Sequence, residues 1–341
     1  MTMAGDRGET SRTLFSAQIL VFVVVGLFGN LNILYATYQH ERLRTKNGIF
    51  LAQLAVLHII ALVFELNNAY YEYFAIPVVR DECFKKMTPL MLVHGWQGSM
   101  YFVMAVNFLY SVLKPLKYRF IETYRYCLWL NLPSIAYTLA LYTWSYFSMN
   151  DDIIPFCNPP LAYPTIISKV NAMSQLLLTL FAFGCFIGAY ATVKYKDLVD
   201  IGKQCPPCCF QGSPLKKTTC VGCHFARALV LLTVVSGFAW LCLHFMVFSA
   251  YFWTDNRLYQ GYIQSYAVIF ALICYTQDYF IFYCRSELYR SAFQLQINKL
   301  LCWEVFDVKR LHSTSEQQRR ANSEKLLGSQ RSSTAITASS N

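Results

Sequence analysis

The sequence predicts an all-α membrane protein, a bundle of seven transmembrane helices with its amino terminus outside the cell. Seven apolar stretches each reach the ~20 residues that a helix needs to cross the ~30 Å hydrocarbon core of a bilayer. The chain of 341 residues is 55% hydrophobic and only 14% charged, a composition that a soluble domain of this length does not have. Lysine and arginine are concentrated in alternate loops, as in multi-pass membrane proteins.

The transmembrane domain is expected over residues 14–284, and its helices at 14–38, 49–71, 87–113, 126–147, 164–193, 225–252 and 259–284. No water satisfies backbone N–H and C=O groups inside a bilayer, so each stretch must form its hydrogen bonds internally, as a helix. None of the stretches alternates polar and apolar residues as a half-buried strand does. Residues 1–13 are polar and predict an extracellular amino terminus, followed by a first helix that acts as an uncleaved signal anchor.

The charge of the loops predicts the orientation. The three inner loops carry three, four and six Lys or Arg residues, and the three outer loops carry three, none and one. Cytoplasmic loops retain positive charge during insertion, so this imbalance places the amino terminus outside. The net charge of +10 then faces anionic membrane lipid and gives no reason to expect a nucleic-acid partner.

This topology sorts the thirteen cysteines by redox compartment, and only Cys83 and Cys157 face the oxidising side. A disulfide between them would tie the loop before the fifth helix to the outer start of the third. The alternative is two free thiols, which is disfavoured because an exposed thiol pair outside the cell oxidises.

A second group of cysteines lies in the expected third inner loop, as two CxxC pairs: Cys205 with Cys208, and Cys220 with Cys223. Such pairs resemble a zinc ribbon that would join the inner ends of the fifth and sixth helices, although the spacing between the pairs is short. The favoured interpretation is a reduced, partly lipidated patch beside the membrane. Zinc is therefore a speculative cofactor, and no other cofactor is predicted.

A set of landmarks in a fixed order carries a resemblance to a known family. They are Gly29-Asn30-Leu31-Asn32, Leu51-Ala52-Gln53-Leu54-Ala55, Glu65, Cys83, Lys114-Pro115-Leu116-Lys117-Tyr118, the stretch from Cys157 to Ala162, Trp240, and the stretch from Ser286 to Phe293. The chain resembles the rhodopsin-like receptors and, among them, the nematode serpentine chemoreceptors of the sx class (Srsx). The resemblance implies a plasma-membrane receptor, in a sensory cilium, that binds an extracellular small molecule or peptide and activates a heterotrimeric G protein.

The inner end of the third helix departs from the pattern of these receptors. An arginine of an Asp-Arg-Tyr triplet is expected there, but counting back from Pro115 and forward from Cys83 both lead to Phe108. Asn107, Phe108 and Leu109 therefore replace the triplet. Because the resemblance gives that arginine a role in coupling, its loss favours an alternative: a receptor-like protein that does not couple by itself and pairs with another receptor as a dimer.

Further positions for activation follow from the same resemblance. Trp240 stands at the tryptophan of the sixth helix, while Asp278 and Phe282 stand in the element that ends the seventh. His58 replaces a buried aspartate that binds sodium in these receptors, and a neutral imidazole is a poor ligand for a hard cation. Sodium modulation is therefore not predicted.

Polar side chains in the outer half of the helices are candidates for ligand binding, because they are costly in a membrane. They are Glu65, Asn68, Glu72, His94, Gln97, Tyr101, Lys169, Asn171, Trp240 and His244. Hydrogen bonding between helices explains each of them equally well. Leu90 stands where amine receptors carry an aspartate, so a biogenic amine is not expected.

Residues 285–302 predict a short amphipathic helix on the inner leaflet, with Leu288, Ala292 and Leu295 on one face and Cys302 as a palmitoylation candidate. Residues 303–341 predict a disordered cytoplasmic tail. No catalytic constellation is present, so an enzyme is not predicted. The rival from another class, a heptahelical transporter or zinc-dependent membrane hydrolase, needs ligands inside the bundle that the sequence lacks.

Overall fold

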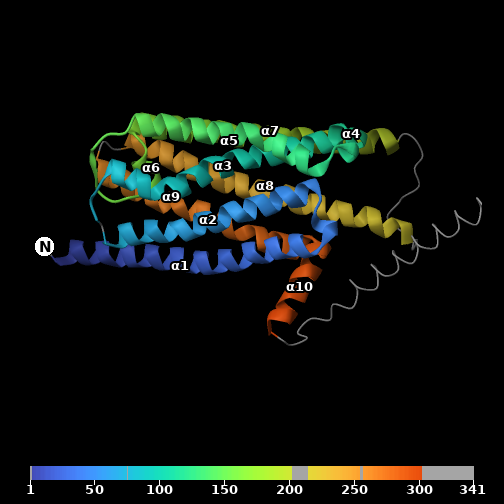
Figure 1. The fold of residues 1–341 in the computed structure, drawn as a ribbon, viewed down its shortest axis with the longest axis horizontal. Coiled ribbons are helices and arrows are strands. Elements are labelled where there is room, and N and C mark those ends of the chain that lie inside the picture. The colour runs from blue at the N-terminus through green and yellow to red at the C-terminus, as the bar shows by residue number, and fades with distance from the viewer. Residues whose placement is uncertain (1, 75, 202–213, 254–255, 302–341) are drawn as a thin grey trace, which may run out of the picture.

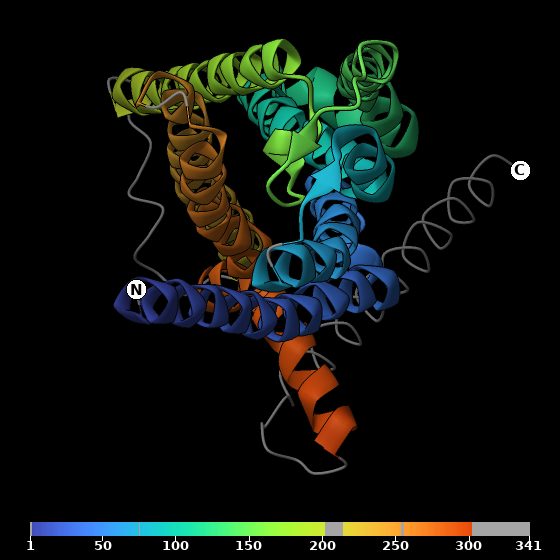
Figure 2. The same ribbon diagram turned by 90° about the vertical axis from the view of Figure 1, so that its left-hand side faces the viewer.

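Seven long helices form an elongated bundle in the computed structural model, which describes residues 2–74, 76–201, 214–253 and 256–301. The helices are α1 Thr2–Gln39, α2 Lys46–Phe74, α3 Arg80–Leu113, α5 Thr123–Phe147, α7 Thr165–Ile201, α8 Pro214–Trp253 and α9 Arg257–Arg285. They lie side by side along the long axis of the molecule (Figure 1) and enclose a common core when seen from the end (Figure 2). Each corresponds to one of the seven predicted stretches.

Shorter elements connect these helices. They are the 3₁₀ turn η1 Glu41–Leu43, α4 Pro115–Phe120, α6 Pro159–Ala162, α10 Glu287–Leu301, and the strands β1 Val78–Val79 and β2 Ile153–Ile154. The strands pair antiparallel, with Val78 opposite Ile154, so the described residues are helical apart from this small sheet and the connecting loops. We call the end of the bundle with the sheet the outer end, and the end with α10 the inner end.

Two helices, α1 and α8, begin more than ten residues earlier than the hydropathy predicts. The polar residues before position 14 continue α1 back to Thr2, because no proline interrupts them and extending a helix costs less than starting one. α8 begins at Pro214, and proline suits the first turn of a helix because its missing N–H has no partner there anyway.

The early start of α8 corrects the prediction that all four CxxC cysteines lie in a loop. Cys220 and Cys223 belong to the helical residues of α8, while Cys205 and Cys208 lie outside the described residues, as do Cys302 and the tail 303–341. Among the described residues, no group of three His, Cys, Asp or Glu side chains could hold a metal ion. The zinc interpretation stays an untested prediction.

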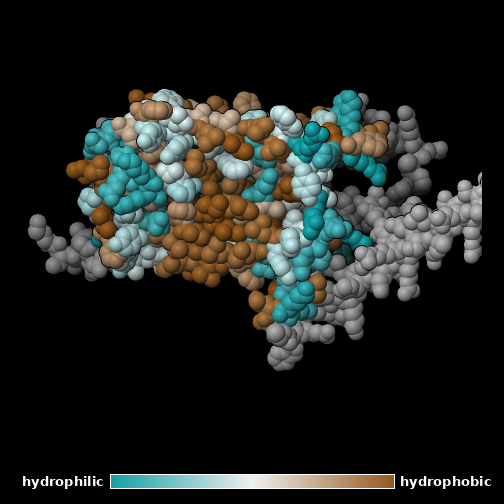
Figure 3. Space-filling model, viewed as in Figure 1, coloured by the Kyte–Doolittle hydropathy of each residue, from teal (hydrophilic) through white to brown (hydrophobic). Residues whose placement is uncertain are grey.

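The surface of the bundle has an apolar belt between two polar ends (Figure 3). Five of the described helices are long and apolar enough to cross a membrane, within α1, α2, α7, α8 and α9. Large side chains such as Val24, Trp129 and Phe181 are mostly exposed on the outside of the bundle, which is typical of a surface that faces lipid. The chain is therefore a multi-pass membrane protein.

α3 occupies the centre of the arrangement and is less apolar than its neighbours. It packs against α2, α5, α6, α7 and α8, so its polar side chains face other helices. Gly98 permits a close approach to α7, because a Cβ atom at this position would overlap Oε1 of Gln175. Small residues at such crossings are typical of helix packing in membranes.

α10 turns away from the bundle at the inner end (Figure 1). Its buried residues are Tyr289, Ala292, Phe293 and Gln296, which is a face rotated by one position from the predicted one. The Phe293 ring packs 4.6 Å from the ring of Tyr279 on α9, and the Tyr289 hydroxyl lies 3.4 Å from Thr37 Oγ1 on α1. Packing against α1 and α9 selects this face.

Candidate functional site

A lid covers the outer end of the bundle, and a disulfide fixes it. Cys83 at the start of α3 and Cys157 are joined, with their Cα atoms 5.4 Å apart, as the sequence predicts. Asn158 begins α6: its Oδ1 accepts from the Leu161 N–H at 2.9 Å, and its Nδ2 donates to Ser265 Oγ on α9 at 3.3 Å. The segment from Cys157 to Ala162 is thus anchored to two helices.

A cavity of about 60 Å³ lies beneath this lid. Its walls come from α3, the lid with α6, α7, α8 and α9. Three of the predicted ligand-binding residues, His94, Asn171 and His244, line it. The remaining predicted residues lie behind these walls or at other levels of the bundle.

Glu65 lies directly behind His94 and is fully buried. Its Oε1 is 3.7 Å from His94 Nε2, and its Oε2 accepts from Asn68 Nδ2 at 2.9 Å. The Tyr275 hydroxyl lies 2.5 Å from the same His94 nitrogen. The His94 ring is 20% exposed, so it connects the cavity with a buried carboxyl group on α2.

Trp240 forms an aromatic cluster below the cavity. Its ring stacks on His244 with centroids 5.1 Å apart, and it meets the rings of His94 and Tyr101 at 6.1 Å each. The Tyr101 hydroxyl lies close to Ser236 and to Trp240, whereas the buried Gln97 amide has no hydrogen-bond partner among the described residues. His94 and His244 belong both to this cluster and to the cavity wall.

Two predicted residues lie away from the cavity. Glu72 is buried at the outer end of α2 and is not part of the cavity wall. Lys169 lies over the ring of Tyr251, with Nζ 5.3 Å from the centroid.

Sequence reasoning missed some residues that line the cavity, notably Tyr163, Ser168 and Gln264. Gln264 is an amide inside an apolar helix, and its spacing from Val268 and Ala271, which share the wall, is that of one helical face. This pattern is visible in the sequence and could have predicted Gln264 as a cavity residue. The positions of Tyr163 and Ser168 depend on how the lid and α7 pack, which no local pattern encodes.

His58 and Asp278 meet in the middle of the bundle. His58 Nδ1 is 3.3 Å from Asp278 Oδ2, and both side chains are almost completely buried. The histidine at the expected sodium position thus faces the carboxylate of the seventh long helix.

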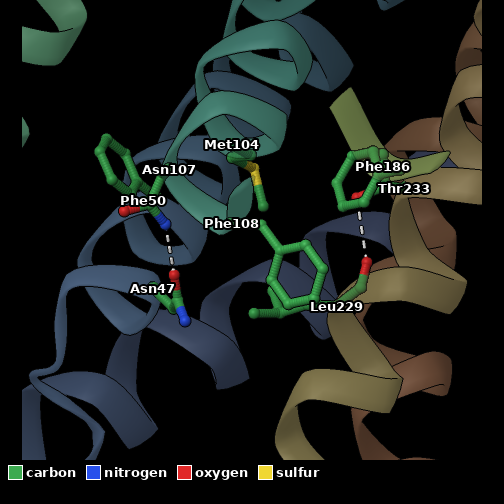
Figure 4. A pocket seen from close by; sticks show the side chains of 8 residues that line it. All are labelled: Asn47, Phe50, Met104, Asn107, Phe108, Phe186, Leu229 and Thr233. Atoms are coloured by element: carbon green, nitrogen blue, oxygen red, sulfur yellow. Dashed lines mark hydrogen bonds between the residues drawn. The ribbon is translucent and has the colours of Figure 1, made fainter. Parts of the chain in front are cut away.

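The inner end of α3 places Phe108 among hydrophobic side chains of α7 and α8 (Figure 4). Its ring stacks on Phe186 with centroids 5.5 Å apart. A space of about 10 Å³ lies among the side chains of α2, α3, α7 and α8 at this end, about the minimum for one water molecule. Neighbouring Asn107 donates to Asn47 Oδ1 on α2 at 2.5 Å, so hydrogen bonding and aromatic packing hold this end.

The loop after α3 is fixed to α2. Lys46 Nζ donates to the Tyr118 carbonyl at 2.6 Å and lies 4.4 Å from the centroid of the Tyr118 ring. Burial raises the pKa of Tyr118 well above its ordinary value, so its hydroxyl stays protonated. The loop is therefore a packed part of the inner end.

A multi-helix membrane bundle with a disulfide-anchored lid, a cavity beneath it and a tryptophan under the cavity fits the class of multi-pass membrane receptors. A family profile described as serpentine type 7TM GPCR chemoreceptor Srsx matches residues 23–297, and the chain belongs to this family. A comparison with curated proteins gave no match. The family is one of receptors, not of enzymes, and it agrees with the resemblance found in the sequence.

Proposed function

We propose that this protein is a chemosensory receptor of the plasma membrane, with its amino terminus outside and all seven long helices spanning the bilayer. An extracellular small molecule or peptide enters beneath the lid, and movement of α7 and α8 at the inner end passes the signal to a heterotrimeric G protein. Because the family is one of chemoreceptors, we place the receptor in a sensory cilium.

The cavity is the observation that carries this proposal. It lies under the disulfide-anchored lid, and two of its walls, His94 and His244, contact the Trp240 ring. A ligand that shifts either imidazole therefore shifts the side chain in the middle of α8. The helix runs without interruption from Pro214 to Trp253, so a tilt at Trp240 reaches its inner end.

Phe108 favours a second candidate function. A receptor that lacks the arginine at this position, and fills the space with an aromatic stack, has lost a charged contact to the G protein. Such a chain would bind ligand and signal through a partner receptor. The transporter and hydrolase alternatives have no comparable support, because the family is a receptor family.

Constitutive and agonist-stimulated G-protein activation in a heterologous cell tests the proposal. The wild type is compared with Phe108→Arg and with Asn107→Asp combined with Phe108→Arg. Coupling by the wild type is the expected result, with a change of about two- to tenfold when Phe108 is replaced, since the aromatic stack is lost.

Leu109→Arg is the matched control, because it adds the same charge one position along α3. Phe108→Leu removes the stack without adding charge. Signalling by the restored double mutant alone would transfer the function to the partner-dependent candidate. Absence of signalling from every variant, despite surface expression, would contradict autonomous coupling.

A further inference from the structure

The wall of the cavity formed by α9 carries an amide that has no hydrogen-bond partner among the described residues. Gln264 is fully buried, and neither its Oε1 nor its Nε2 makes a hydrogen bond with any residue that the structure describes. The Tyr251 hydroxyl interacts only weakly with the Gln264 side chain, because its hydrogen bond is donated to Ser168 Oγ at 2.7 Å. A buried amide without partners costs free energy, and a ligand that supplies both partners would remove that cost.

The other walls restrict the charge of such a ligand. Among the residues that line the cavity there is no carboxylate, lysine or arginine, and Met91, Leu243, Val247 and Val268 make much of its surface apolar. A charged ligand would lose its hydration without gaining a counter-charge. Glu65 is not part of the cavity wall, and its Oε1 lies 3.7 Å from Nε2 of His94, which is part of that wall.

The size of the cavity restricts the ligand further. Its volume of about 60 Å³ is less than half that of an engineered cavity of about 150 Å³ that binds benzene. A molecule of a few non-hydrogen atoms, such as one five-membered ring, is the largest that fits after small side-chain movements.

We propose that the cavity binds a small uncharged molecule that presents a cis amide or carboxamide group to Gln264. The ligand N–H would donate to Gln264 Oε1, its carbonyl would accept from Gln264 Nε2, and its apolar part would pack against Leu243 and Val268. This inference rests on the proposed ligand site and names the chemical class that the site selects.

Four compounds of nearly equal size separate the contributions: γ-butyrolactam, with donor and acceptor; cyclopentanone, with an acceptor only; pyrrolidine, a cation; and cyclopentane. The purified full-length receptor in lipid nanodiscs is titrated with each, and the rise of its thermal midpoint gives an apparent Kd. The lactam should bind at least about tenfold more tightly than the other three, because only it satisfies both amide atoms.

Gln264→Leu should remove this preference without unfolding the receptor, because the Gln264 amide makes no hydrogen bond to the described residues that could be lost. Gln264→Glu should move the preference to pyrrolidine. Gln277→Leu is the matched control, since this buried amide of the same helix bonds to Ser236 away from the cavity and should leave the preference intact.

The inference would be overturned if pyrrolidine or cyclopentane bound as tightly as the lactam, or if no compound bound. It would also be overturned if Gln264→Leu kept the preference for the lactam. The binding measurement contains no G protein, so a failure of coupling leaves it unaffected. Conversely, activation of the receptor by a ligand of another chemical class would contradict only the proposed amide ligand and not the proposed receptor function.

Discussion

At the scale of single residues, His58 and Asp278 form a buried pair that the sequence alone does not reveal. From the sequence alone, His58 stands where a sodium-binding aspartate is expected, and Asp278 is an unrelated polar residue of another helix. In the structure their side chains are 3.3 Å apart and buried. Removing one member of such a pair leaves the other without compensation, which costs more than removing both.

We therefore expect His58→Leu to lower the free energy of unfolding by about 3 kcal/mol, and the double variant His58→Leu with Asp278→Leu to be close to the wild type. Denaturation in mixed micelles measures both. Asp81→Asn, which alters a partly exposed carboxylate paired with Lys85, is the control and should change little. Additive losses in the double variant would mean that the two side chains do not interact.

For Phe108, the sequence predicts the position along the helix but not the contacts of the side chain. Its position follows from counting along α3, because helical spacing is fixed by the backbone. The contacts of its side chain depend on the packing of other helices against α3. The stack on Phe186 joins α3 to α7, and no count along α3 could find it.

At the scale of elements, α3 and α7 can cross closely because Gly98 has no side chain. Gln175 donates to the Gly95 carbonyl at 3.3 Å and fills the space beside Gly98. Larger side chains at position 98 would separate the helices that form two walls of the cavity. Close packing of this kind is the main attraction between helices in lipid, where the hydrophobic effect does not drive association.

Gly98→Ala should lower the free energy of unfolding by about 1–3 kcal/mol, because its Cβ would displace the Gln175 amide. The loss is measured by thermal denaturation in detergent. Gly184→Ala on α7 is the matched control: a Cβ there meets nothing within 4 Å, and alanine favours the helix. Combining Gly98→Ala with Gln175→Ala should recover part of the loss, and no recovery would count against the clash as its cause.

At the scale of the whole molecule, charge and hydropathy give the bundle two different ends. The apolar belt in Figure 3 separates them, and the excess of Lys and Arg in alternate loops distinguishes the inner from the outer end. The same polarity places the disulfide at one end and α10 at the other.

An epitope tag before Met1 should therefore be labelled by antibody on intact cells, and a tag after Asn341 only after permeabilisation. Fluorescence microscopy on transfected cells measures both, and a tagged cytosolic protein checks that the cells are intact. Labelling of the carboxyl-terminal tag on intact cells would reverse the topology and move the lid and its cavity to the cytoplasmic side.

The sequence by itself determined the membrane class, the approximate positions of the seven long helices and the cysteines of the disulfide, and it predicts that Phe108 stands in place of the arginine expected in α3. These features are local: they follow from hydropathy, charge and spacing along one segment, because the bilayer acts on each helix separately. Only the tertiary structure decided which polar residues line the cavity, that His58 meets Asp278, that the Gln264 amide makes no hydrogen bond to the described residues and which face of α10 is buried. Contacts between helices depend on their mutual rotation and separation, which are set by packing of side chains distant in the chain.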